Sequence, residues 1–276
     1  MSPARALREH WPEYLIEGWA LGCFMLSAAF FTLLLEHPGS PLRAALDGEL
    51  LRRALIGLAM GLTAVALIYS PWGKRSGAHM NPAVTLTFLR LGKVARVDAW
   101  FYVLAQTVGA LVGVLLASAI AGAAFTGPPV SFIATRPGAA GVAVAFVAEM
   151  AISFGLMLVV LIFSNRPRLA PFTGLAAGVL VAAYITFEAP LSGMSMNPAR
   201  SLASAAPASQ WDDLWLYFSA PLLGMLAAAA LVTRGVFRAQ VGCAKLQHAQ
   251  DQRCIHCGYK PPFQTSSERT ENEPAI

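Results

Sequence analysis

Charged residues are scarce in this chain. Asp, Glu, Lys and Arg make up only 13% of its 276 residues, whereas 56% are hydrophobic. This balance lies outside the range of ordinary soluble domains, so a protein that folds in water is excluded. The residues up to Tyr14 also lack the short apolar core and small-residue cleavage site of a secretory leader. We therefore expect an integral membrane protein that is made without a cleaved leader.

A basic face is also missing. The net charge of +5 comes from Lys and Arg scattered through the predicted loops, which gives a nucleic-acid interface little support, and we expect no nucleic-acid partner. The apolar stretches show no pairing of a nucleophile with a base, so we expect no enzymatic activity. Binding, structural or transport functions remain.

Six apolar stretches are long enough to cross a bilayer, which takes roughly 20 residues each. They are residues 15–35, 51–70, 100–122, 142–164, 170–190 and 213–235. An even number of spans places both termini on one side, and most Lys and Arg of the loops fall on that side. The positive-inside rule then predicts cytoplasmic termini. The Ala-rich chain and its short termini favour a plasma membrane, specifically a bacterial inner membrane.

One eight-residue motif occurs twice, 116 residues apart. The copies read SGAHMNPA at residues 76–83 and SGMSMNPA at residues 192–199, with six of eight positions identical. Each copy follows two spans and precedes a third, so the second half is inverted relative to the first. The sequence therefore predicts an all-α membrane protein with six transmembrane helices, two re-entrant half-helices and an inverted 3+3 repeat.

The repeat also sets the domain boundaries that we predict. A cytoplasmic N-terminal segment covers residues 1–13, and a membrane domain covers residues 14–238 in halves of about 14–124 and 142–238. A cytoplasmic tail covers residues 239–276.

The segments after each Asn-Pro-Ala, residues 84–91 and 200–206, are too short to span and fit half-membrane helices. Asn81 and Asn197 are good helix caps, and Pro at the first helical position needs no N–H partner. Each capping Asn accepts through its side-chain oxygen and keeps its amide N–H groups free to donate. Where two such helices meet, a water that accepts from both Asn side chains cannot relay a proton, and two positive helix ends face it.

Non-helical backbone at membrane depth requires burial in protein or contact with water. The turns before each Asn therefore predict a water-filled path with a ladder of carbonyl acceptors, those of Gly77, Ala78, His79, Gly193, Met194 and Ser195. Two ionisable residues within spans, Glu17 and Glu149, are candidates for anchoring the free N–H groups of these turns. The alternative for both is an interfacial position near a span end.

These features resemble the major intrinsic proteins, the aquaporin and glycerol-channel family. The resemblance covers residues 14–238 and rests on the two Asn-Pro-Ala motifs (Asn81, Pro82, Ala83 and Asn197, Pro198, Ala199), the paired glutamates, and two tyrosine motifs, Tyr102-Val-Leu-Ala-Gln106 and Tyr217-Phe-Ser-Ala-Pro221. It implies a passive channel for water and small uncharged solutes in a lipid bilayer. It also implies a homotetramer in which every subunit has its own pore, and no cofactor for transport.

The resemblance further implies a selectivity filter made of Met60, Ile185, Met194 and Arg200. A cation there repels protons and metal ions and donates hydrogen bonds to a neutral solute. Strict water channels usually carry His at the position of Ile185, and glycerol channels carry aromatic residues around the Arg; this chain has neither. We expect water, with glycerol, urea, hydrogen peroxide or uncharged metalloid acids as alternative solutes. A further alternative is a non-conducting scaffold in which Met60 and Met194 meet across the pore.

Three of the four cysteines fall within fifteen residues of the tail. With one histidine they read Cys243-x₄-His248-x₅-Cys254-x₂-Cys257, and a Cys₃His set is a common tetrahedral zinc site. His256 is a weaker ligand candidate. The alternatives are a disordered tail with incidental thiols, typified by residues 265–276, and acylation of Cys243 near the membrane.

Overall fold

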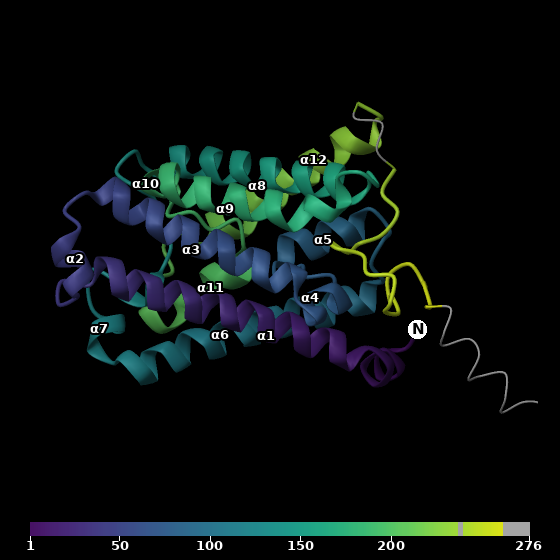
Figure 1. The fold of residues 1–276 in the computed structure, drawn as a ribbon, viewed down its shortest axis with the longest axis horizontal. Coiled ribbons are helices and arrows are strands. Elements are labelled where there is room, and N and C mark those ends of the chain that lie inside the picture. Colours follow the sequence, from purple (N-terminus) through teal and green to yellow (C-terminus); the bar gives the residue numbers. More distant parts are fainter. Residues whose placement is uncertain (237–239, 262–276) are drawn as a thin grey trace, which may run out of the picture.

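The fold is a bundle of helices in a computed structural model that describes residues 1–236 and 240–261. Every regular element among these residues is helical. Six helices are long and apolar enough to cross a membrane: α1 (Pro3–Glu36), α3 (Glu49–Tyr69), α6 (Arg96–Ala121), α8 (Val142–Ser164), α9 (Thr173–Phe187, extended by a short 3₁₀ turn) and α12 (Leu214–Thr233). They run side by side along the long axis of the molecule (Figure 1).

Two shorter helices begin at the Pro of each Asn-Pro pair, and the preceding Asn caps each of them as the sequence predicts. They are α5 (Pro82–Arg90) and α11 (Pro198–Ala208). Short turns join the remaining elements: α2 (Pro41–Ala45), α4 (Pro71–Ser76), α7 (Ala123–Thr126), η1 (Ser131–Ile133), η2 (Ala170–Phe172) and α10 (Ala189–Ser192). The predicted architecture of six spans and two half-helices is confirmed.

The packing follows the inverted repeat. Within the first half α1 packs along α6, and within the second half α8 packs along α12, while α3 and α9 form the seam between the halves. The α1–α6 contact is close because glycine faces backbone: a Cβ on Gly109 would collide with the carbonyl of Gly18. Small residues of this kind let membrane helices approach closely.

The first helix begins earlier than the predicted first span. The side chain of Ser2 caps it by accepting from the backbone N–H of Arg5, and Pro3 occupies the first turn. Residues 3–13 are therefore the opening turns of α1. Within them Glu13 is fully buried and pairs with Arg75.

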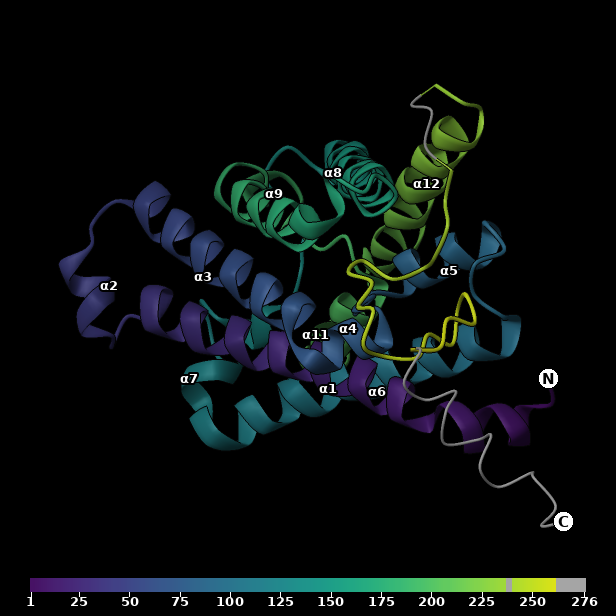
Figure 2. The ribbon, with the colours of Figure 1, turned by 45° about the vertical axis from the view of Figure 1, so that its right-hand side comes forward.

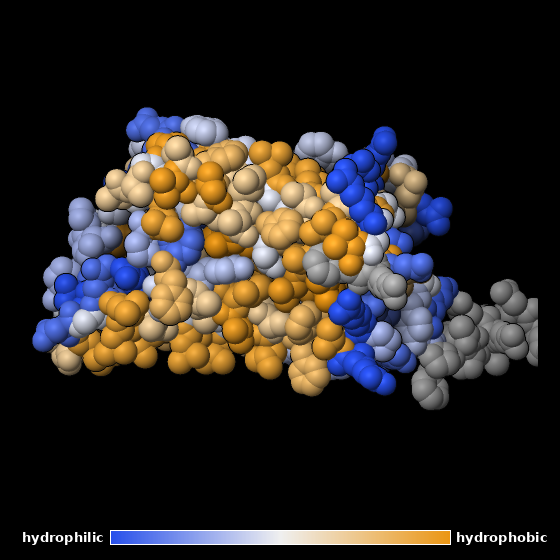
Figure 3. All heavy atoms as spheres, turned by 90° about the horizontal axis from the view of Figure 1, so that it is seen from above, coloured by the Kyte–Doolittle hydropathy of each residue, from blue (hydrophilic) through white to orange (hydrophobic). Residues whose placement is uncertain are grey.

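The outer surface carries the apolar side chains of a lipid-facing protein. Large hydrophobic residues are exposed on the spans, including Trp100 (76%), Ile120 (81%) and Phe187 (72%). The space-filling view shows a hydrophobic middle zone between hydrophilic ends (Figure 3). Water would disfavour such a surface and a bilayer would not, which agrees with an integral membrane protein.

Substituting Gly109 by Val tests the close contact between α1 and α6. The added side chain would meet the backbone of Gly18, and overpacking of this kind usually costs about 1–3 kcal/mol. We expect the midpoint of thermal unfolding in detergent, measured by size-exclusion chromatography after heating, to fall. Val108→Leu adds volume on the exposed side of the same helix and should leave the midpoint unchanged. Equal midpoints for both variants would contradict this packing.

Candidate transmembrane pore

A buried carboxylate supports each re-entrant turn. In the second half, Glu149 Oε1 accepts from the backbone N–H of Ser195 (2.6 Å) and from Ser192 Oγ (2.9 Å), and Oε2 accepts from the N–H of Met196 (2.7 Å). The glutamate is 0% exposed. Its two oxygens therefore satisfy donors that the turn leaves without helical partners.

Glu17 makes the matching contacts in the first half. It accepts from the backbone N–H groups of His79 (3.0 Å) and Met80 (2.6 Å) and from Ser76 Oγ (2.7 Å). Glu17 is also 0% exposed, so neither glutamate has the interfacial position considered as the alternative. One contact has no counterpart, because Gln106 Nε2 donates to Glu17 Oε2 (2.9 Å), whereas Pro221 stands at the matching position of the second half.

The backbone of the two turns follows the same path. Positive φ angles occur at matching positions of the repeats: Gly77, Ala78 and Met80, and Gly193, Met194 and Met196. Positive φ is uncommon for residues other than glycine and persists only where the surroundings fix it. Here the carboxylates fix it, together with Tyr102 and Tyr217, whose hydroxyls donate to the carbonyls of Ser76 (2.7 Å) and Ser192 (2.6 Å).

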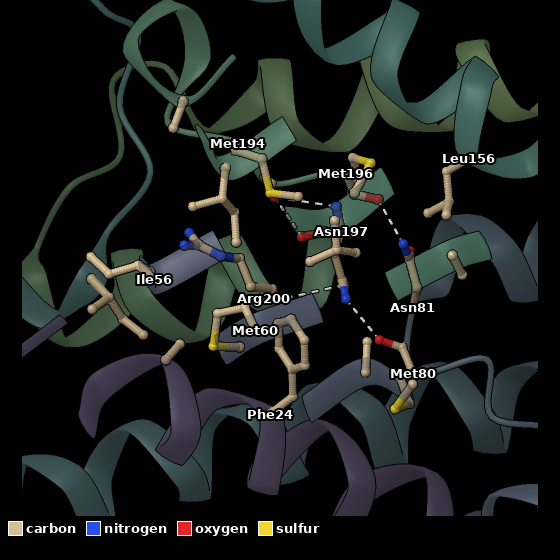
Figure 4. Close-up of a pocket in the computed structure, with 18 of the residues that line it drawn as sticks. Phe24, Ile56, Met60, Met80, Asn81, Leu156, Met194, Met196, Asn197 and Arg200 are labelled. Carbon is tan, nitrogen blue, oxygen red and sulfur yellow. Dashed lines mark hydrogen bonds between the residues drawn. The ribbon is translucent and has the colours of Figure 1, made fainter. Parts of the chain in front are cut away.

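The two half-helices are joined through their capping asparagines. Asn81 Oδ1 accepts from the N–H of Ala83 (2.8 Å), while its Nδ2 donates to the carbonyl of Met196 (2.7 Å). Asn197 Nδ2 donates in return to the carbonyl of Met80 (2.7 Å), and Figure 4 shows both cross-links. Each amide group uses one N–H in this way and keeps a second. The sequence predicted free amide groups and missed the cross-link.

A cavity of about 610 Å³ passes this meeting point. Asn81 and Asn197 line its middle, and charged residues from α1, α2 and α3 line one end; we call this end the Arg200 mouth. The other end is lined by apolar residues from α3, α5, α8 and α9 and by Leu246 from the segment after α12; we call it the tail-side mouth.

All four predicted filter residues line this cavity. Met60, Ile185, Met194 and Arg200 come from α3, α9, the second turn and α11. The Nη1 atom of Arg200 is buried and has no hydrogen-bond partner among the residues that the structure describes, so the guanidinium retains a donor. In Figure 4 its side chain lies near Met194, Met60 and Ile56.

Three residues that sequence reasoning missed also line the cavity. Phe24 of α1 and Ile56 of α3 lie near the filter (Figure 4), and Leu246 lies at the opposite end. Helix periodicity alone does not reveal which face of an all-apolar helix meets a pore, because both faces carry the same residue types.

The predicted metal ligands in the tail lie together. The ligand atoms of Cys243, His248, Cys254 and Cys257 all lie within 4.8 Å of one another. Zinc bound to sulfur at about 2.3 Å in a tetrahedron separates neighbouring sulfurs by about 3.8 Å, and Cys243 Sγ and Cys254 Sγ are 3.5 Å apart. The residues present therefore fit a closed Cys₃His site.

His256 lies outside this cluster. Its ring stacks on that of His79, with centroids 5.6 Å apart, and its Nε2 lies 3.1 Å from the carbonyl of Ser76. Burial lowers the pKa of His256 to about 4, so the neutral ring donates to this carbonyl. A hydrogen bond from the thiol of Cys243 lowers the pKa of the Cys254 thiol below its ordinary value. The predicted tail end, residues 265–276, lies outside the described residues.

Glu149→Ala tests how strongly the carboxylate holds its turn. The substitution leaves the N–H groups of Ser195 and Met196 buried without an acceptor, at about 1–3 kcal/mol for each lost partner. We expect a marked fall in the thermal midpoint of the detergent-purified protein. The control, Glu49→Ala, removes an exposed ion pair with Arg53, which contributes about 0–1 kcal/mol. Equal effects of the two substitutions would show that the turn does not depend on Glu149.

Known proteins share this sequence and architecture. The profile described as Major intrinsic protein matches residues 23–232. Aquaporin NIP2-1 of Oryza sativa subsp. japonica is 31% identical over 228 residues, which cover 82% of this chain and 72% of that protein. Aquaporin NIP1-3 of the same plant is 35% identical over 175 residues, which cover 63% of this chain and 59% of that protein. The match thus spans about three fifths of the second relative.

A solved structure shows the same fold. The X-ray structure of the aquaglyceroporin from Plasmodium falciparum superposes with a TM-score of 0.67 at 19% identity, covering 82% of this chain and 96% of that one. The two relatives named above are plant proteins, so they give no support to the expected bacterial inner membrane. The inverted repeat, the joined half-helices and a family profile that matches most of the sequence agree, and the chain belongs to the major intrinsic protein family.

Proposed function

We propose that the chain is a passive transmembrane channel for water and small uncharged solutes. One observation carries this proposal: the capping asparagines of two inverted half-helices meet inside a single cavity that also reaches Arg200. The relatives named aquaporins support it. No catalytic step is part of the proposal, because transport through an open path needs none.

Charge selectivity follows from the same geometry. The N-termini of α5 and α11 each carry a partial positive charge of about half a unit, and both point at the meeting point. Asn81 and Asn197 each keep one N–H for a passing water, which then accepts twice and is poorly oriented to relay a proton. Arg200 adds a full positive charge at the filter. Cations and protons are therefore repelled at two levels, while neutral solutes pass.

The apolar filter favours water together with somewhat larger neutral solutes. Met60, Ile185 and Met194 offer no side-chain donor beside Arg200, and methionine adapts its shape to what passes. Glycerol, urea, hydrogen peroxide and uncharged metalloid acids fit this chemistry. A non-conducting scaffold is not favoured, since the relatives are named aquaporins and both methionines line the same cavity as Arg200.

The assembly and orientation belong to the same proposal. The family resemblance implies a homotetramer with one pore per subunit in the lipid bilayer. The positive-inside rule places both termini in the cytoplasm. The tail-side mouth would then be the cytoplasmic mouth.

A structural zinc ion in the tail completes the proposal. The described contacts among Cys243, His248, Cys254 and Cys257 suit a closed tetrahedral site without an open position for substrate. Zinc there would fold the tail and would not itself bind the transported solute.

Stopped-flow light scattering on proteoliposomes tests the channel itself. We expect protein reconstituted with a zinc chelator to raise osmotic water permeability above that of empty liposomes. Asn197→Asp should lower this permeability about tenfold or more, because the carboxylate brings a negative charge and cannot donate to the carbonyl of Met80. The control, Asn165→Asp at the end of α8, should conduct like the wild type. Flux at the level of empty liposomes from folded wild-type protein would contradict the proposal.

Ile185→His tests the width of the filter. The imidazole adds polar bulk beside Arg200, so glycerol entry, followed by light scattering after a glycerol gradient, should fall several-fold while water flux persists. Ile185→Leu conserves the volume and should leave both fluxes unchanged. Unaltered glycerol entry through Ile185→His would show that this position does not limit solute size.

A further inference from the structure

The segment after α12 lies at the end of the molecule where α1 begins (Figure 2), and its Leu246 lines the tail-side mouth. It is docked on the turn that precedes α5. The backbone N–H of Leu246 donates to the carbonyl of Gly77 (3.1 Å), and His79 Nε2 lies 2.6 Å from the carbonyl of Ala244. These contacts join residues more than 160 positions apart in the sequence. The segment is therefore part of the pore's own structure.

A buried lysine adds to this docking. Lys245 is 1% exposed, and its Nζ donates to the carbonyls of Lys74 (2.9 Å) and Arg253 (3.3 Å). A buried ammonium group is costly unless its N–H groups find acceptors. The position of the segment is thus specified by polar contacts, not only by apolar contact with the channel.

Leu246 occupies the place where the cavity would open on this side. Its side chain is only 6% exposed, although it lies beyond the last transmembrane helix. It belongs to one buried apolar cluster with Ile68, Val84, Val160 and Ala177. Those four come from α3, α5, α8 and α9, and all of them line the cavity together with Leu246. An apolar side chain within an apolar ring excludes water from the mouth.

The docking also occupies a polar group of the expected water path. The carbonyl of Gly77 is one of the acceptors predicted to line the path, and it accepts the N–H of Leu246. Gly77 itself is not among the residues that line the cavity, whereas the next two residues, Ala78 and His79, are. The segment therefore occupies a carbonyl directly beside the cavity wall.

The metal ligands lie on both sides of the docked residues. Cys243 and His248 flank residues 244–247, so a metal bound by both closes a short loop with Leu246 near its tip. Cys254 and Cys257 flank His256, which contacts the carbonyl of Ser76 and the ring of His79. The residues that contact the turn before α5 thus all lie in the sequence between the first ligand, Cys243, and the last, Cys257.

From these observations we propose that zinc bound by Cys243, His248, Cys254 and Cys257 holds Leu246 in the tail-side mouth and closes the pore, and that loss of zinc opens it. The proposal rests on the channel function and the tail zinc site proposed above. Closing the loop with a metal removes the conformational freedom that would otherwise let residues 244–247 leave the mouth. Without zinc, Leu246 can still make the same contacts, but residues 244–247 are no longer constrained in a closed loop.

The test compares water flux and zinc content of the full chain in proteoliposomes. Wild-type protein is reconstituted with zinc and then treated with a membrane-permeant zinc chelator, so that both orientations in the bilayer are reached. We expect one zinc per chain before treatment and low osmotic permeability. Chelation should raise permeability at least about five-fold, the lower end of usual coupling between a ligand site and a conformational change.

Two variants distinguish the role of the Leu246 side chain from the role of the bound zinc. Leu246→Ala should keep its zinc and conduct at the open level whether or not the chelator is present. The double variant Cys254→Ala, Cys257→Ala should bind no zinc and conduct at the same level. Cys23→Ala, in α1 and remote from the tail, is the matched thiol control and should respond to the chelator like the wild type.

The outcomes distinguish this proposal from the channel function beneath it. If zinc-loaded wild type conducts as fast as Leu246→Ala, closure of the mouth by Leu246 is overturned, while the proposed channel function is retained. If the wild type binds no zinc, the metal control is overturned. If no variant conducts in either metal state although each is folded, the channel function itself fails.

Discussion

Two buried carboxylates determine the centre of this molecule. A turn at membrane depth leaves backbone N–H groups without partners, and neither lipid nor helix can satisfy them. Glu17 and Glu149 each accept from two such groups and from a serine hydroxyl. Because the turns are fixed, both half-helices can begin at the same depth with their asparagines facing each other. The cross-links, the cavity and the position of Arg200 all depend on this support.

Much of the fold could be predicted from the sequence because it is encoded twice. The repeated motif, with spans on either side, indicated the half-helices and their inversion, and the structure has both. The paired glutamates could be located since an ionisable residue in an apolar helix is conspicuous. The filter positions Met60 and Ile185 depended on family resemblance, because nothing in an apolar span marks the side that meets the cavity. Phe24 was missed for this reason.

The tail shows a different limit. Spacing of sulfur and nitrogen ligands predicted that Cys243, His248, Cys254 and Cys257 belong together, since metal coordination leaves a local pattern. It gave no sign of where the cluster lies. The contacts that dock it involve backbone carbonyls, such as that of Gly77, which every residue possesses. Leu246 has no periodic neighbours and reads as an ordinary tail residue. Tertiary contacts of this kind cannot be predicted from any local sequence pattern.

Hydrogen–deuterium exchange tests the support of the two turns most directly. In protein held in lipid nanodiscs and analysed by mass spectrometry, peptides that cover residues 76–83 and 192–199 should exchange slowly. Their N–H groups are bound by Glu17 and Glu149, although residues of both turns line the cavity. The connection between η1 and α8, residues 134–141, provides the comparison. Exchange of both turns as fast as that connection would contradict the account, because the carboxylates would then not be holding the pore's centre.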